Sequence, residues 1–182
     1  EKFSIIQLYA ASVELVSVSR ISIFNNTIQS CFLDLAAETV DGMALEEIGV
    51  FNNTLSGGLL KLDTFSLKSI RLRKGSMDNL WNIRNINITQ NAVNGNLIDL
   101  SSEEVDSTTL AMMFYSIANL SLVNNSFKQS ERTSDQPNSV ITSYNIGFKI
   151  SNLSFWENAL NVTSFVELTG EMATIVIANS SF

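Results

Sequence analysis

The chain has 182 residues, of which 45% are apolar and 16% are charged; its net charge is −7 and it contains no histidine. This composition excludes a disordered polyelectrolyte, and the acidic balance argues against a nucleic-acid partner, because phosphate binding needs clustered Lys and Arg. Without histidine the chain lacks the commonest general base and metal ligand, and its single cysteine, Cys31, excludes an internal disulfide and a thiolate zinc site.

An eight-residue phrase returns six times along the chain. It consists of an apolar–x–apolar triplet, a polar bend and one further apolar residue. The copies are Ile21–Ile28, Ile48–Leu55, Ile86–Val93, Leu120–Phe127, Leu153–Leu160 and Ile175–Phe182. Self-similarity at a period of about 20–50 residues is typical of a solenoid, propeller or other repeat array.

Two further apolar blocks accompany most copies of the phrase. The first follows it, at Phe32–Leu35, Leu59–Leu62, Leu97–Leu100, Val140–Ser143 and Phe165–Leu168, with an earlier copy at Ile5–Leu8. The second precedes the next phrase, at Val13–Val18, Leu80–Ile83, Met112–Tyr115 and Ile146–Ile150. Short apolar or alternating runs bounded by Asn, Gly and Ser indicate strands.

Three strands per repeat with no helix between them predict an all-β chain wound as a parallel β-helix of about six coils. Residues 1–182 would form one segment of it, and the block at Ile5–Leu8, which has no phrase before it, suggests that the segment belongs to a longer chain. The last two phrases start 22 residues apart, which we interpret as close to a bare coil. Longer steps would carry insertions, mainly after the second strand, in stretches such as Ser101–Thr109 and Lys128–Asn138.

The sixth position of the phrase predicts an internal ladder. Where one strand bends into the next, an inward amide can bond both to the turn backbone and to its copy in the next coil, since strands stack about 4.8 Å apart. The residues expected in this ladder are Asn26, Asn53, Asn91, Asn125, Asn158 and Ser180.

The phrase resembles the repeat of right-handed parallel β-helix proteins, the pectin-lyase-like superfamily. In that family an apolar–x–apolar–x–x–Asn–x–apolar segment precedes a second short strand, and the resemblance covers nearly the whole chain. It implies a right-handed coil, but the family includes lyases, hydrolases, adhesins and surface fibres, so it implies no single activity.

A search for catalytic chemistry leads to no candidate catalytic residues. The outward position of the block after the phrase gives one column, Asp34, Lys61, Asp99, Thr142 and Glu167. Its alternating signs favour cross-strand charge pairing over the closely spaced carboxylate pair that a glycosidase needs. The acidic runs Glu46–Glu47 and Glu103–Asp106 are interpreted as solvated rather than as calcium ligands, so we expect no metal and no cofactor.

A column of large residues follows the triplet, at Phe24, Phe51, Thr89, Val123, Trp156 and Ala178. Aromatic residues on such a face could contact sugars or a partner, but only half of the column is aromatic. Ordinary packing at the bend is therefore the favoured interpretation.

Eight asparagines begin an Asn–x–Ser/Thr triplet, the acceptor sequence for N-glycosylation. They are Asn25, Asn52, Asn87, Asn119, Asn124, Asn152, Asn161 and Asn179. Four of them directly precede an expected ladder residue, and strand alternation predicts that the sequon asparagines face outward. In each Asn–Asn pair the second amide would turn inward and the first would carry a glycan.

These patterns predict a secreted or cell-surface N-glycoprotein that acts as a structural or adhesive rod, such as a fibre subunit. Its partners would be its own kind or neighbouring coils of a longer chain, with carbohydrate contact a further possibility. No apolar run has the length of a membrane span. Two alternatives stay open: a carbohydrate-active enzyme whose catalytic coils lie elsewhere, and a binding module that uses the Lys128–Asn138 stretch.

Overall fold

The computed structural model describes residues 4–40, 42–67, 81–105, 114–128, 139–162, 164–170 and 175–182. Within these ranges every regular element is a β-strand and every strand pair is parallel. The expectation of an all-β chain built from parallel strands is therefore confirmed. The described ranges contain no helix long and apolar enough to cross a membrane.

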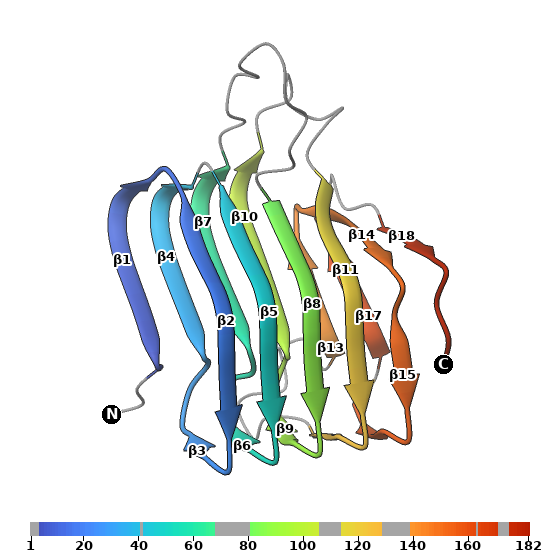
Figure 1. The fold of residues 1–182 in the computed structure, drawn as a ribbon. Coiled ribbons are helices and arrows are strands. Elements are labelled where there is room, and N and C mark those ends of the chain that lie inside the picture. Colours follow the sequence, from blue (N-terminus) through green and yellow to red (C-terminus); the bar gives the residue numbers. More distant parts are fainter. Residues whose placement is uncertain are drawn as a thin grey trace.

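The strands form three sheets, which we name A, B and C (Figure 1). Sheet A contains β1 (Ile6–Val13), β4 (Leu33–Val40), β7 (Leu60–Leu67), β10 (Ile98–Val105), β13 (Ser139–Tyr144) and β17 (Ser164–Thr169). Sheet B contains β2 (Val16–Phe24), β5 (Met43–Phe51), β8 (Trp81–Thr89), β11 (Phe114–Val123), β14 (Gly147–Ser151) and β18 (Ile175–Ala178), with β15 (Ser154–Trp156) paired to β11. Sheet C contains β3 (Thr27–Ile28), β6 (Thr54–Leu55), β9 (Ala92–Asn94), β12 (Ser126–Lys128) and β16 (Ala159–Asn161).

The chain passes from sheet A to sheet B to sheet C and returns to sheet A, adding one rung to each sheet per pass. Sheet B faces the viewer in Figure 1, sheet A lies behind it, and successive rungs proceed from the N-terminus on the left to the C-terminus on the right. This order of three parallel sheets is consistent with a β-solenoid.

The division of a coil into strands differs from the expected one. The block before each phrase and the triplet of the phrase were expected as two strands, but β2, β5, β8 and β11 each run through both. The third strand is instead the short piece that follows the ladder asparagine, such as Thr27–Ile28. The cause is a bend at one residue in the middle of these four strands, which turns each strand without ending it. In the next coil the bend at Asn152 does separate β14 from β15.

The bare coil has 27 residues and not 22. Leu33 pairs with Leu60, and the final strand pairs Ile175 with Phe148, both at a spacing of 27. The last phrase therefore aligns with the block before the fifth phrase and not with the phrase itself. Apolar alternation is the same on both sides of the bend, so periodicity alone could not separate these two registers.

Insertions enter the coil at two corners rather than one. Sheet B shifts by 38 residues between β5 and β8, against 27 for the preceding step in sheet A, so extra residues lie between sheets A and B. Sheet A shifts by 43 residues between β10 and β13, against 34 in sheet C, so others lie between sheets C and A. Most of Lys128–Asn138 belongs to this second corner, outside the described residues.

The core consists of apolar rows that stack from coil to coil. One row in sheet A is Leu33, Leu60, Ile98 and Ile141, all with 0% exposure. A single coil cannot bury these side chains alone, so each depends on its neighbours for the removal of apolar surface from water. At the C-terminal end the rows give way to aromatic rings, with Phe155 and Phe165 centroids 5.1 Å apart and Phe182 against both.

Asparagines form the inner ladder on the sheet B side of the bend into sheet C. Asn53, Asn91 and Asn125 are only 2–3% exposed. The backbone N–H of Asn53 donates to Asn91 Oδ1 at 2.8 Å, and its Nδ2 donates to the same oxygen at 3.1 Å. Asn91 repeats both bonds to Asn125, and Asn125 repeats them to Asn158.

The same Nδ2 groups also bond the backbone of the preceding coil. Asn91 Nδ2 donates to Val50 O at 2.8 Å and to Thr89 O at 2.9 Å, so one amide satisfies carbonyls of two coils. Asn26 is the exposed first rung: its N–H donates to Asn53 Oδ1, and its Nδ2 donates to Phe24 O. The ladder asparagines thus connect neighbouring coils at the corner between sheets B and C.

We predict that Asn91→Ala lowers the free energy of unfolding by about 2–4 kcal/mol, because it leaves the buried N–H of Asn53 without its acceptor and removes the amide that donates to Val50 O and Thr89 O. The matched control is Asn26→Ala at the exposed first rung, which should cost under about 1 kcal/mol. Urea unfolding of both variants, made without glycosylation, measures the difference. Equal losses for the two variants would contradict the assignment of the ladder as a buried network.

Candidate functional site

The outer face of sheet B carries a column of residues in left-handed backbone conformation at the bend. Arg20, Glu47 and Asn85 have φ of 55–58°, and the column continues with Asn119, Asn152 and Asn179 at φ of 53–56°. The residue before each of them also points outward, so the alternation of the strand is reset. Asparagine tolerates this conformation better than other side chains except glycine, because its short amide can bond locally.

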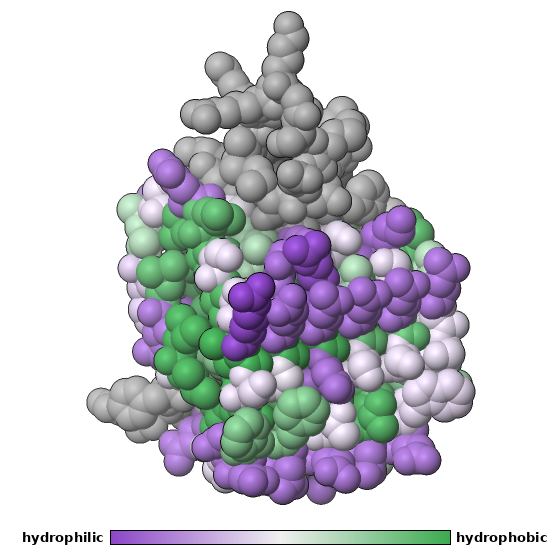
Figure 2. Space-filling view, in the orientation of Figure 1, coloured by the Kyte–Doolittle hydropathy of each residue, from purple (hydrophilic) through white to green (hydrophobic). Residues whose placement is uncertain are grey.

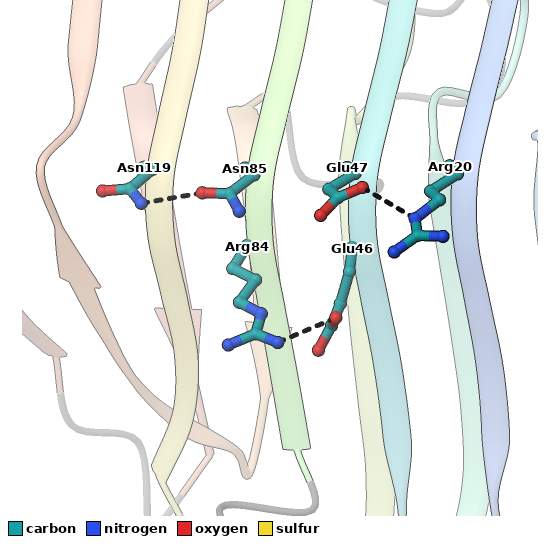
Figure 3. A network of polar contacts seen from close by, with 6 residues as sticks. All are labelled: Arg20, Glu46, Glu47, Arg84, Asn85 and Asn119. Carbon is teal, nitrogen blue, oxygen red and sulfur yellow. Dashed lines mark hydrogen bonds and ion pairs between the residues drawn. The ribbon is translucent and has the colours of Figure 1, made fainter.

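Polar contacts connect this bend column from coil to coil (Figure 3). Arg20 Nε lies 3.2 Å from Glu47 Oε2, and Arg84 Nη2 lies 2.9 Å from Glu46 Oε2. Beyond them the contacts become amide to amide: Asn119 Nδ2 donates to Asn85 Oδ1 at 2.8 Å. Asn152 Nδ2 donates to Asn119 Oδ1 at 2.8 Å. Figure 2 shows the result as a hydrophilic band across β2, β5, β8 and β11.

A second left-handed column lies at the end of the sheet B strands, next to the inner ladder. It contains Asn25, Asn52, Gln90, Asn124 and Glu157, with φ of 53–59°. Asn52 Nδ2 donates to Asn25 Oδ1 at 2.8 Å. The Asn–Asn pair therefore divides as expected in orientation, with Asn52 exposed and Asn53 buried.

The last repeat places Asn179 and Ser180 differently from the expectation. Because Ser151 pairs with Ala178, Asn179 follows Asn152 in the bend column and does not belong with Asn25 and Asn52. Ser180 Oγ accepts the backbone N–H of Leu153 at 3.3 Å and makes no bond to Asn158. Ser180 is therefore not a rung of the asparagine ladder, which in the described residues runs from Asn26 to Asn158.

All eight sequon asparagines are exposed on the outer faces of the sheets. They are Asn25, Asn52, Asn87, Asn119, Asn124, Asn152, Asn161 and Asn179. Six of them have positive φ, and the exceptions are Asn87 in β8 and Asn161 in β16. Backbone conformation alone is thus a reason for asparagine at six sequons. The sequence contains a signal for this left-handed position, because the residue before the triplet is polar in each coil. With Arg20 and Glu47 in the first two coils, however, the position resembles an ordinary variable surface position.

Figure 2 shows hydrophobic surface between the band at the bend and a second hydrophilic band nearer the ends of the sheet B strands. The column after the triplet contributes exposed aromatic side chains to sheet B. Phe24 and Trp156 are 59% and 51% exposed, so the column after the triplet is not ordinary interior packing. Its rings lie back over the strand: a Cβ on Gly49 would lie 2.5 Å from Phe51 Cε2, and Trp156 Nε1 donates to Ser154 Oγ at 3.2 Å. Ala178 does not belong to this column, since it aligns with Ser151.

On sheet A the expected outward column is in register. Asp34 pairs with Lys61, Lys61 with Asp99, Asp99 with Thr142, and Thr142 with Glu167. Tyr9 Oη donates to Asp34 Oδ2 at 3.0 Å, and Thr142 Oγ1 donates to Asp99 Oδ1 at 3.2 Å.

Asp99 is a carboxyl group of this face with a shifted pKa. Its pKa is raised above 3.8, mainly because burial penalises the charged form, and Asp63 adds to the shift. The Thr142 hydroxyl and the Lys61 ammonium oppose it. Asp63 lies on the same strand as Lys61, two residues further along, so it is a diagonal neighbour of Asp99. Strand geometry gives a Cα–Cα distance of about 8 Å between the two aspartates. The expected outward column contains one position per strand and therefore does not include Asp63.

The acidic runs are only partly described. Glu46 and Glu47 are each paired with an arginine, which leaves them poor calcium ligands. The side chains of Glu103 and Glu104, and all of Asp106, lie outside the described residues. The described part of the chain holds no cluster of three potential metal-binding side chains. Cys31 is buried, and burial raises the pKa of its thiol, so it is a weak nucleophile.

We predict that Asn119→Val lowers the free energy of unfolding by about 2 kcal/mol, because a β-branched side chain is strained at φ of 54°. Asn119→Gly should stay within about 1 kcal/mol of the parent. Ser121→Val, two residues along the same strand, is the control for adding a valine to this face and should cost under about 0.5 kcal/mol. The prediction is wrong if urea unfolding gives Asn119→Val and Ser121→Val the same loss.

We also predict a pH-dependent effect of Asp99→Asn. Because the folded pKa of Asp99 is raised above 3.8, the folded state holds this proton more tightly than the unfolded state. Its contribution to stability is present at low pH and is lost as pH rises through the folded pKa. The variant should therefore match the parent near pH 3.5 and become relatively more stable toward pH 7. Glu167→Gln makes the same change of charge in the same column, and a constant difference from pH 3.5 to 7 contradicts the assignment.

Comparison with known proteins yields no relative. No family model matches the chain, and no curated protein and no solved structure is significantly similar to it. The function of the chain has therefore to be inferred from its own residues and their geometry.

Proposed function

We propose that the chain is a segment of a secreted or cell-surface, N-glycosylated β-helix that serves as a structural or adhesive rod. The observation that carries the proposal is the exposure of all eight sequon asparagines beside a buried ladder of the same residue type. A chain in which exposed asparagines repeatedly have Ser or Thr two residues later offers glycan acceptors on several coils. Glycans on the outer faces would shield the rod along its length, and no cofactor is required.

A right-handed winding, as in the pectin-lyase-like proteins that the phrase resembles, is supported by the chain path. In Figure 1 the rungs proceed from left to right, the front strands β2, β5 and β8 run downward, and β1 and β4 run upward behind them. Connections between parallel strands of one sheet are right-handed in about 98% of cases. We therefore propose the right-handed form of the β-helix.

End-to-end stacking is supported by the edges of the sheets. In the described structure β1 pairs only with β4, and β17 pairs only with β13, so each end presents a strand edge that can pair further. The ladder has complementary ends: no described residue donates to Asn26 Oδ1, and Asn158 presents a backbone N–H donor in the position that Asn125 uses toward its neighbour. The partner we propose is a further coil of the same kind, from this chain or from another copy.

Intact mass is the direct test of glycosylation. The chain secreted from a eukaryotic host should lose mass in several glycan-sized steps when an amidase removes N-linked sugars, and each freed asparagine should become aspartate. At least four sequons should be occupied. The same chain made in a bacterial cytosol provides the unglycosylated reference. A secreted protein with unmodified Asn25, Asn52 and Asn124 that also stays monomeric at high concentration contradicts the proposal.

A second function has one observation in its favour. Asp99 has a raised pKa and lies diagonal to Asp63 on the neighbouring rung, and glycoside hydrolases act through two neighbouring carboxyl groups. The chain would then be part of a carbohydrate-active enzyme, with Asp99 as the proton donor. Hydrolysis or cleavage of an acidic polysaccharide that both Asp63→Asn and Asp99→Asn abolish would establish this alternative.

A further inference from the structure

Two outward columns of sheet B make Asn87 unlike the other sequon asparagines. Asn87 stands in a column of small residues, in register with Ser22, Gly49, Ser121 and Ser154. The adjacent column contains Phe24, Phe51, Thr89, Val123 and Trp156. Whether a ring covers a small residue therefore depends on the side chain two positions further along the same strand.

Rings cover the small column one rung before Asn87 and two rungs after it. The Phe51 ring lies over Gly49, one rung before Asn87, and the Trp156 indole reaches Ser154, two rungs after it. The two rungs between these rings carry Thr89 and Val123, which are short. We name Asn87–Thr89 and Ser121–Val123 the ring-free rungs; the covered positions Gly49 and Ser154 are three strand steps apart, about 14 Å at about 4.8 Å per strand.

The Asn87 side chain has no structural reason for its identity comparable to that of the other exposed asparagines. Its φ is not positive, whereas Asn52, Asn119 and Asn152 are left-handed and donate Nδ2 to a neighbouring amide. Asn87 Oδ1 accepts from Thr89 Oγ1 at 2.9 Å, and no described residue accepts a hydrogen bond from its Nδ2. Asparagine is also disfavoured in the middle of a strand, so its presence here calls for another cause.

We infer that Asn87 carries a glycan whose first sugar lies on the ring-free rungs against the face of Phe51. This inference rests on the proposed function, because it requires passage through a glycosylating secretory route. A pyranose ring has an apolar face of C–H groups, which can pack against an aromatic ring and shield it from water. The small side chain of Ser121 on the following rung leaves room for the sugar, and the Phe51 ring over Gly49 bounds this space on the preceding rung. Thr89 and Val123 provide the surface beside it.

The covalent step is the ordinary transfer to an amide. Asn87 Nδ2 bonds to C1 of an N-acetylglucosamine, and the bond from C1 to the pyrophosphate oxygen of a lipid-linked oligosaccharide donor breaks. The lipid pyrophosphate leaves with that electron pair, and Nδ2 loses one proton to a base. The remaining Nδ2–H and the Oδ1 contact to Thr89 are unaffected.

The test combines site occupancy with coupling between the glycan and Phe51. The chain is secreted from a eukaryotic host, its glycans are trimmed to one sugar per site by an endoglycosidase, and the eight sequon peptides are analysed by mass spectrometry. Asn87→Gln, Phe51→Leu and the double variant are then compared by thermal unfolding, each also in unglycosylated form from bacteria. Asn161→Gln is the matched control, since Asn161 is the other exposed sequon asparagine without positive φ.

We expect Asn87 to be occupied and Asn87→Gln to lower the Tm of the glycosylated protein by about 2–4 °C, with no change in the unglycosylated form. Phe51→Leu should cost more in the glycosylated parent than in glycosylated Asn87→Gln, which is the signature of direct coupling. Asn161→Gln should have the same Tm difference in both forms.

Two results would overturn the inference alone: other sequons occupied with Asn87 empty, or Asn87 occupied with the cost of Phe51→Leu independent of the sugar. Absence of glycan from every sequon would instead remove the proposed function, and the inference with it.

Discussion

The inner amide ladder is the interaction on which the architecture depends. A parallel β stack satisfies its backbone along the strands, but the chain must leave each strand at a corner, where N–H and carbonyl groups lose their sheet partners. The Oδ1 atoms of Asn53, Asn91 and Asn125 accept the corner N–H of the coil before, with one side chain per coil. Since each amide bonds the next coil as well as its own, the corner can be buried only when neighbouring coils are in register.

The second constraint is the left-handed backbone at two places in each full coil. One occurrence bends the sheet B strand and the other turns it toward sheet C, as at Arg20 and Asn25 in the first coil. Both conformations are costly for most side chains, and the chain meets them with asparagine in most coils. Where the bend instead carries Arg20 and Glu47, an exposed ion pair joins the two coils, although pairs this exposed contribute little to stability. The outer polar contacts therefore follow from the backbone rather than determine it.

Much of this fold is visible in the sequence because stacking repeats the same demand in every coil. Apolar rows such as Leu33, Leu60 and Ile98, and the ladder from Asn26 to Asn158, recur at positions that can be aligned by eye. The sheet A column around Lys61 was predictable for the same reason.

Local geometry that periodicity does not encode could not be predicted. In β2, β5, β8 and β11 a residue with positive φ lies between two apolar blocks that belong to one strand. Apolar residues alternate on both sides of it, so Ile175–Ile177 resembles a phrase although it lies before the bend. The burial that raises the pKa of Asp99 depends on what covers the sheet, which no repeat position reports.

Because all ladder bonds run in the same direction, the loss of a coil has different consequences at the two ends of the stack. Each Oδ1 receives N–H groups from the coil before it, so removing a coil from the N-terminal side frees a ladder acceptor. It also frees backbone donors, such as the N–H groups of Thr54 and Ser56, which bond carbonyls of the first coil. Removing a coil from the C-terminal side frees backbone N–H donors, and buried donors without partners are rarer in proteins than underused carbonyls. The aromatic cluster of Phe155, Phe165 and Phe182 lies at the C-terminal end, so the loss of the last coil would also remove apolar packing between rings. This cluster is therefore the reason to expect that proteolytic or evolutionary shortening is tolerated at the beginning of the stack sooner than at its end.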